Sequence, residues 1–174
     1  MVNNQEYQVP TWNQIYDMLL NQTQKINKAH FNPDIIVAVS RGGLVPARIL
    51  SDLLEVQNLA IIRVEFYVGI NKTREKPIIT QSLSAPVTAK KVLIVDDISD
   101  TGKSLKLVTE HILTQGATEA QTATIYAKPA STFTPDYFEK QTSSWVIFPW
   151  DTKETIRKIL QKQNGKRALN KEIA

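Results

Sequence analysis

Short apolar runs alternate along this chain with segments in which apolar residues recur every three or four positions. Four stretches have the composition or spacing of strands: 35–40, 59–68, 92–95 and 118–127. Three others have helical spacing: 11–28, 44–56 and 105–113. The runs are apolar on both faces, which is typical of parallel strands covered by helices. The pattern therefore predicts an α/β fold with a parallel twisted sheet flanked by helices.

Local signals support several of these boundaries. Thr11 and Gln14 have the spacing of a capping box after Pro10, and Gly116 predicts the end of the helix that begins near 105. Residues 69–89 separate two predicted strands, show no clear periodicity and contain two prolines. A loop of that length in a compact domain usually has a function or moves.

Length and composition limit the organisation of the chain. With 174 residues, of which 42% are hydrophobic and 22% charged, we expect one globular domain over 1–174. The N-terminal MVNNQEYQVP is polar and lacks the apolar core of a signal peptide, and no apolar run is long enough to cross a membrane. We therefore expect a cytoplasmic protein. The absence of cysteine excludes disulfides and thiolate chemistry.

The net charge of +4 is modest. Part of it lies in the tail KRALNKEIA and part in the segment 72–76. An anionic small substrate explains local positive charge as well as nucleic acid does, so nucleic acid is not expected as a partner.

The candidate chemistry begins where the apolar run 92–95 ends in Asp96 and Asp97. Asp100 follows, and small hydroxyl residues and Gly102 lead into a helix, which makes a strand, a polar loop and a helix start. Ligands bind at the carboxyl ends of parallel strands, and helix N-termini suit phosphate. Three acids within five residues repel one another unless they share a cation or a donor-rich ligand. A nucleotide-binding P-loop is excluded, since Asp97 occupies its first glycine position.

A second polar segment follows the run 35–40. The paired glycines Gly42 and Gly43 allow a ligand to approach the backbone closely, and Arg41 supplies a fixed positive charge suited to a diphosphate oxygen.

Three motifs together resemble a known family. VLIVDDISDTGKS at 92–104 resembles the signature of type I phosphoribosyltransferases, and VAVSRGGLVPARIL at 37–50 is similar to the pyrophosphate-binding segment of their xanthine-guanine branch. WVIFPWD at 145–151 resembles the base-binding hood of that branch. The resemblance implies a hood over about 129–153 and a C-terminal helix and tail over 152–174.

The resemblance also implies a site for phosphoribosyl pyrophosphate and Mg²⁺. The implied binding residues are Ser40, Arg41, Gly42, Gly43, Arg74, Asp96, Asp97, Ile98, Ser99, Asp100, Thr101, Gly102, Lys103 and Ser104. Arg74 is matched to a pyrophosphate-contacting arginine on a flap, with Lys72 and Lys76 as alternatives, and Asp97 is matched to the metal. Family members also often have a cis peptide bond in the loop at 40–43.

Purine recognition is implied for four residues. Lys128 is matched to a lysine that donates a hydrogen bond to the oxygen on purine C6. Trp145 is matched to a residue that stacks on the base. The backbone carbonyls of Trp145 and Val146 would accept hydrogen bonds from NH groups of the purine ring. Asp100 is the expected catalytic residue. Its carboxylate would accept a hydrogen bond from the N7 position of the purine or remove the proton on N7. Ile147 stands where the branch has an acidic residue, so the preferred 6-oxopurine is not predicted.

The expected function is transfer of phosphoribose to N9 of guanine, xanthine or hypoxanthine in purine salvage, by a homodimer or homotetramer. Two alternatives stay open. One is a non-enzymatic regulator that senses phosphoribosyl pyrophosphate, and the other is an enzyme of the same family that acts on adenine or a pyrimidine.

Overall fold

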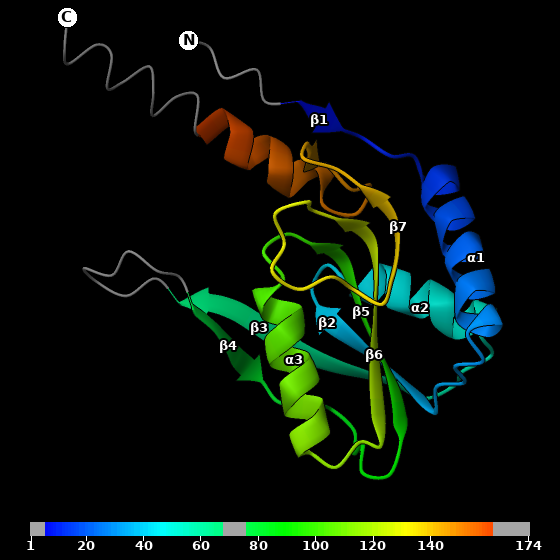
Figure 1. Ribbon diagram of the computed structural model, residues 1–174. Helices are drawn as coiled ribbons and strands as arrows, with labels where there is room; N and C mark the ends of the chain where they lie inside the picture. The colour runs from blue at the N-terminus through cyan, green and yellow to red at the C-terminus, as the bar shows by residue number, and fades with distance from the viewer. Residues whose placement is uncertain (1–5, 68–75, 162–174) are drawn as a thin grey trace, which may run out of the picture. The chain divides into compact units, whose positions relative to one another are not determined.

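The computed structural model describes residues 6–67 and 76–161 (Figure 1). The chain consists of two compact units. The larger unit consists of residues 15–143, and the smaller consists of residues 1–14 with 144–174. The single domain expected over 1–174 therefore stays a prediction. Helix α1 (Trp12–Lys28) begins in the smaller unit and continues into the larger one.

The larger unit contains a six-stranded sheet in the order β4-β3-β2-β5-β6-β7. Five strands are parallel: β2 (Ile35–Ser40), β3 (Leu59–Tyr67), β5 (Lys91–Ser99), β6 (Glu119–Ala127) and β7 (Tyr137–Gln141). The edge strand β4 (Lys76–Gln81) is antiparallel to β3. The sheet confirms the predicted α/β class, because its central strands are apolar on both faces and need a helix layer on each side.

Helices α2 (Leu44–Leu53) and α3 (Lys103–Thr114) cover opposite faces of the sheet, and α1 lies on the same side as α2 (Figure 1). Leu105, Val108 and Ile112 of α3 form one buried cluster with alternate residues of the strands, such as Val37 and Ile94. The intervening strand residues face the other way because side chains alternate along a strand. Both faces of the central strands are thus buried, as the continuous apolar runs predicted.

Three features of the larger unit differ from the sequence-based expectations. Strand β5 continues through the acids to Ser99, because its backbone pairs with β6 as far as Ser99 and Ala127. Within the expected loop 69–89, β4 pairs with β3, although its sequence has no alternating pattern of its own. Strand β7 was not expected either, and its register with β6 runs from Tyr137 to Gln141.

The smaller unit is held together by segments from both ends of the chain. Strand β1 (Tyr7–Gln8) pairs in parallel with β8 (Trp145–Val146), and the Trp145 amide donates to the Glu6 carbonyl at 3.0 Å. The Trp150 ring stacks on Phe148 at a centroid distance of 4.8 Å and meets Trp12 at 5.7 Å. Residues 152–161 are helical, in agreement with the expected C-terminal helix. Among the described residues, no helix is long and apolar enough to span a bilayer.

Candidate active site

The two polar segments singled out in the sequence lie side by side, because β2 and β5 are neighbouring parallel strands. A Cβ atom placed on Gly42 would lie 2.6 Å from Asp97 Oδ1, and one placed on Gly43 would lie 2.8 Å from the Val39 carbonyl and 3.0 Å from Asp96 Cα. At position 43 only glycine fits, since the close atoms belong to the backbone, whereas a side chain at position 42 would displace the Asp97 carboxyl. The structure thus brings the loop after β2 against the two acids of β5.

The peptide bond between Ser40 and Arg41 is cis, which confirms the conformation that the family resemblance implied for this loop. Arg41 is exposed at the start of the loop, and Gly43 is buried where α2 begins.

The carboxyl of Asp96 is affected by its neighbour Asp97. Burial, and next the charge of Asp97, raise the pKa of the Asp96 carboxyl well above its ordinary value. The Asp97 amide donates to Asp96 Oδ1 at 2.9 Å, which offsets part of that cost. Ionised Asp96 is therefore held at a cost in free energy, and a ligand that donates hydrogen bonds or shares a cation with it would reduce that cost.

We expect Asp96→Asn to stabilise the protein near neutral pH. Because the folded-state pKa of Asp96 is raised, the wild type pays no penalty below the ordinary carboxyl pKa and accumulates it as pH rises toward the folded-state value. The variant avoids that penalty, so its unfolding midpoint at pH 7.5 should be higher by a few degrees.

Thermal unfolding of both proteins between pH 3 and pH 8 checks this expectation. The difference in midpoint should shrink toward acid, because both side chains are then neutral. If the variant is less stable than wild type at pH 7.5, ionised Asp96 does not destabilise the folded protein.

The loop after β5 ends at the N-terminus of α3. Gly102 precedes the helix with φ of 77°, a left-handed conformation that favours glycine. A Cβ there would also lie 2.6 Å from the Phe133 amide nitrogen. Asp100 and Thr101 are exposed on this loop, and the helix start directs backbone NH groups toward the same end. An exposed loop that leads into a helix N-terminus suits a phosphate group.

Residues 131–133 support this loop, and sequence reasoning did not identify them. The buried Ser99 hydroxyl lies 2.9 Å from Ser131 Oγ and donates to the Phe133 carbonyl at 3.1 Å. The Thr132 amide and hydroxyl both donate to the Thr101 carbonyl, at 3.1 and 2.9 Å. The side chain of Ser99 thus faces the protein interior. No periodic signal marks 131–133, because their role depends on a contact with residues about thirty positions away.

Lys128 directly follows β6 and lies beside the same loop. Its amide donates to the Ser99 carbonyl at 2.9 Å, and its Nζ atom donates to the Ser143 carbonyl at 3.1 Å. An ammonium group has three donors, so a bond to Ser143 orients Lys128 and is compatible with an acceptor on a ligand. In the larger unit, Asp96, Asp97 and Lys128 therefore lie with the loop 100–104 at the carboxyl ends of β2, β5 and β6. We call residues 100–104 the phosphate-type loop.

The structure does not test the remaining candidates. Trp145 and Val146 belong to the smaller unit, where the Trp145 side chain is 43% exposed and Val146 is buried. Arg74 and Lys72 lie outside the described residues, and Lys76 is exposed at the start of β4. The expected roles of these residues stay predictions.

The acids fit a divalent cation only when a ligand supplies further oxygens. Within residues 6–67 and 76–161, no three acidic or histidine side chains converge as a metal site. Asp96 and Asp97 nevertheless place two carboxyls together, and their repulsion contributes to the raised pKa of Asp96. Mg²⁺ prefers one or two carboxylates combined with phosphate oxygens and water, which agrees with this arrangement.

The chain is similar to several known proteins. Residues 11–157 match the family model described as a phosphoribosyl transferase domain. A xanthine-guanine phosphoribosyltransferase of Gluconobacter oxydans is 32% identical over 148 residues, which are 84% of this chain and 85% of that protein. A protein of the same name from Nitratidesulfovibrio vulgaris strain Hildenborough is 34% identical over 67% of this chain and 68% of its own length. The crystal structure of a purine phosphoribosyltransferase from Pyrococcus horikoshii is similar, with a TM-score of 0.75, 39% identity and coverage of 83% and 93%.

Proposed function

This chain belongs to the phosphoribosyltransferase family, and from that premise we propose that it transfers phosphoribose from phosphoribosyl pyrophosphate to N9 of a 6-oxopurine. The products are a nucleoside 5′-monophosphate and pyrophosphate, as in purine salvage. The observation that carries the proposal is the meeting of Gly42, Asp96 and Asp97 beside a loop at the start of a helix.

The residues of this site suit the parts of the first substrate. The loop 100–104 and the NH groups at the start of α3 suit the 5′-phosphate. Asp96 and Asp97 suit the two ribose hydroxyls, since carboxylates accept hydrogen bonds from a diol. Ser40, Arg41, Gly42 and Gly43 suit the diphosphate, because the guanidinium charge is fixed and glycines leave the backbone accessible.

Departure of pyrophosphate is the step in which electrostatic stabilisation of the transition state matters most. As the bond to ribose C1 breaks, negative charge develops on the leaving oxygen and positive character on the ring. Arg41 stabilises the first charge, and the carboxylates near the ribose stabilise the second. Asp100 accepts from N7 of the attacking purine or removes its proton while N9 forms the new bond.

Asp97, with phosphate oxygens of the substrate, would hold Mg²⁺. A bound divalent cation neutralises diphosphate charge and lowers the barrier to pyrophosphate departure. We propose that the enzyme depends on Mg²⁺ and acts as a homodimer or homotetramer in the cytoplasm.

The test is nucleotide formation from phosphoribosyl pyrophosphate and Mg²⁺ with guanine, hypoxanthine, xanthine, adenine, orotate and uracil in parallel. We expect product with 6-oxopurines, pyrophosphate in equal amount, and no product after chelation of the metal. Product with adenine, orotate or uracil instead would overturn the proposed base. Tight binding of phosphoribosyl pyrophosphate without product from any base would favour a regulator.

A further inference from the structure

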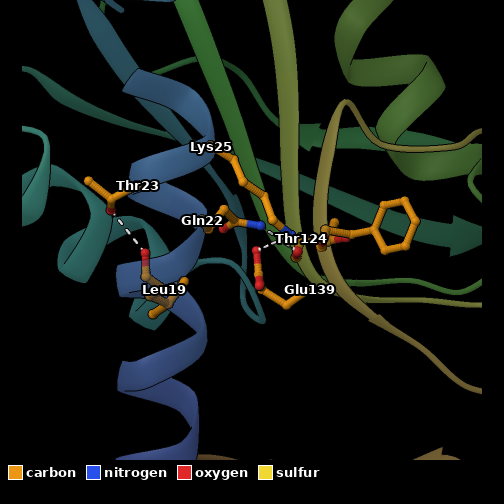
Figure 2. Close-up of polar contacts among 7 residues, drawn as sticks. Leu19, Gln22, Thr23, Lys25, Thr124 and Glu139 are labelled. Carbon is orange, nitrogen blue, oxygen red and sulfur yellow. Dashed lines mark hydrogen bonds and ion pairs between the residues drawn. The ribbon is translucent and has the colours of Figure 1, made fainter. Parts of the chain in front are cut away.

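Helix α1 is joined to the last two strands of the sheet by three polar contacts within the larger unit (Figure 2). The Gln22 side chain is buried, and its Nε2 atom donates to the Thr124 carbonyl of β6 at 2.8 Å. Lys25 Nζ, one turn further along the helix, donates to the Phe138 carbonyl of β7 at 3.1 Å and lies 2.8 Å from Glu139 Oε1. We call Gln22, Lys25 and Glu139 the α1 clamp.

The α1 clamp binds two neighbouring strands at the same position along their length. Thr124 and Phe138 are register partners in the parallel pairing of β6 and β7. Both of their backbone carbonyls accept from side chains of the same helix, since residues three apart on a helix share a face. Because β7 is the edge strand and pairs only with β6 in the described sheet, the α1 clamp is a second attachment for β7.

The ion pair in the α1 clamp is asymmetric. The Glu139 side chain is 8% exposed, whereas that of Lys25 is 50% exposed. A carboxylate buried to this extent needs a compensating cation, and Lys25 supplies it. Loss of Lys25 would leave Glu139 buried without its charge partner, so β7 would have to shift to bring the carboxylate to water.

Strand β7 leads directly to the groups that hold Lys128. Just after β7, the Thr142 amide donates to the Ala127 carbonyl at 3.0 Å. The next residue, Ser143, accepts from Lys128 Nζ at 3.1 Å. Thr142 thus holds the backbone just before Lys128, and Ser143 holds the Lys128 ammonium group. A shift of β7 would move the Ser143 carbonyl and change the direction of the ammonium group.

We propose that Lys25 and Glu139 are positioning residues for purine recognition, which act through β7 and Ser143 on Lys128. The inference rests on the proposed function and on the role predicted for Lys128 from the sequence, a hydrogen bond donated to the oxygen on purine C6. It assigns part of base selectivity to an ion pair between a helix and an edge strand, away from the acids and the phosphate-type loop.

The test compares Lys25→Met, Lys25→Arg and wild type in steady-state assays with guanine and phosphoribosyl pyrophosphate. Methionine keeps the apolar stem and removes the charge. We expect Lys25→Met to raise KM for guanine roughly tenfold and to change KM for phosphoribosyl pyrophosphate less than about twofold. Lys25→Arg should stay close to wild type, since it retains a cation for Glu139.

Two matched controls make the comparison specific. Lys28→Met removes the same charge from the same helix at an exposed residue that has no ion pair within the described chain, and it should leave both KM values unchanged. In a Lys128→Met background, Lys25→Met should add no further rise in KM for guanine, because both changes act on the same donor.

Several outcomes would overturn the inference. A similar rise in both KM values, or a further rise of several fold in the Lys128→Met background, would mean general loosening of the fold. If Lys25→Met does not fold, Glu139→Gln decides, because it removes the ion pair that attaches β7 to α1 without leaving a buried unpaired carboxylate. It should raise KM for guanine about twofold and leave KM for phosphoribosyl pyrophosphate unchanged, and an unchanged KM for guanine would overturn the inference. If wild type forms no nucleotide from any purine, the proposed function fails and this inference fails with it.

Discussion

Asp100→Asn is expected to lower kcat for nucleotide formation by roughly 100- to 10,000-fold, the usual contribution of a general base. Asparagine keeps the size of the side chain and removes the carboxylate that would accept the N7 proton. Asp100 is exposed on the loop between β5 and α3, so its replacement should leave the core intact. Binding of phosphoribosyl pyrophosphate should change much less than kcat.

Steady-state kinetics with the best purine and isothermal titration with phosphoribosyl pyrophosphate separate these two effects. The control is Asp52→Asn, the same change at an exposed carboxylate of α2 whose ion pair with Arg48 is long, at 3.5 Å. Exposed pairs of this kind contribute little to stability, so the control should behave as wild type. Turnover near wild type in Asp100→Asn would exclude the assigned role.

Lys128→Met is expected to lower kcat/KM for 6-oxopurines by roughly 10- to 100-fold. A hydrogen bond from a charged donor contributes about 1.5–3 kcal/mol, which corresponds to that range. The variant should also discriminate less against adenine, which carries a donor at C6 and is opposed by an ammonium group. The loss should lie mainly in KM for the base.

Competition assays with guanine and adenine measure this discrimination, and Lys106→Met on the exposed face of α3 is the matched control. An unchanged ratio of kcat/KM values for the two bases in Lys128→Met would remove Lys128 from base recognition.

The alternation of apolar runs with helical spacing was enough to predict the larger unit's central strands and helices. The strands β2 and β3 were predicted to within one residue, because continuous runs such as that from Ile35 to Val39 are stable only when both faces are buried. The extension of β5 through Asp96 and Asp97, and the strands β4 and β7, could not be read in the same way. Their polar or irregular sequences form strands only because neighbouring strands offer backbone partners.

The candidate residues of the site were identified from local sequence, and their roles stay predictions. Asp96, Asp97, Asp100 and Gly102 lie within one short motif at a junction of strand and helix, so their residue types and spacing carry the information. The support that holds this motif was not readable. No local sequence pattern marks Ser131 and Phe133 as supporting residues. Their contacts with Ser99 exist only because the chain returns to the end of β5.

The sequence by itself determined which segments become central strands and helices, and which residues are candidates for ligand binding, because burial patterns and motif chemistry are local properties of the chain. Only the tertiary structure decided that Gly42 lies against Asp97, that burial raises the pKa of Asp96, and that Lys25 pairs with Glu139. These properties depend on the order of strands in the sheet and on burial. Both arise from contacts between residues far apart in the chain.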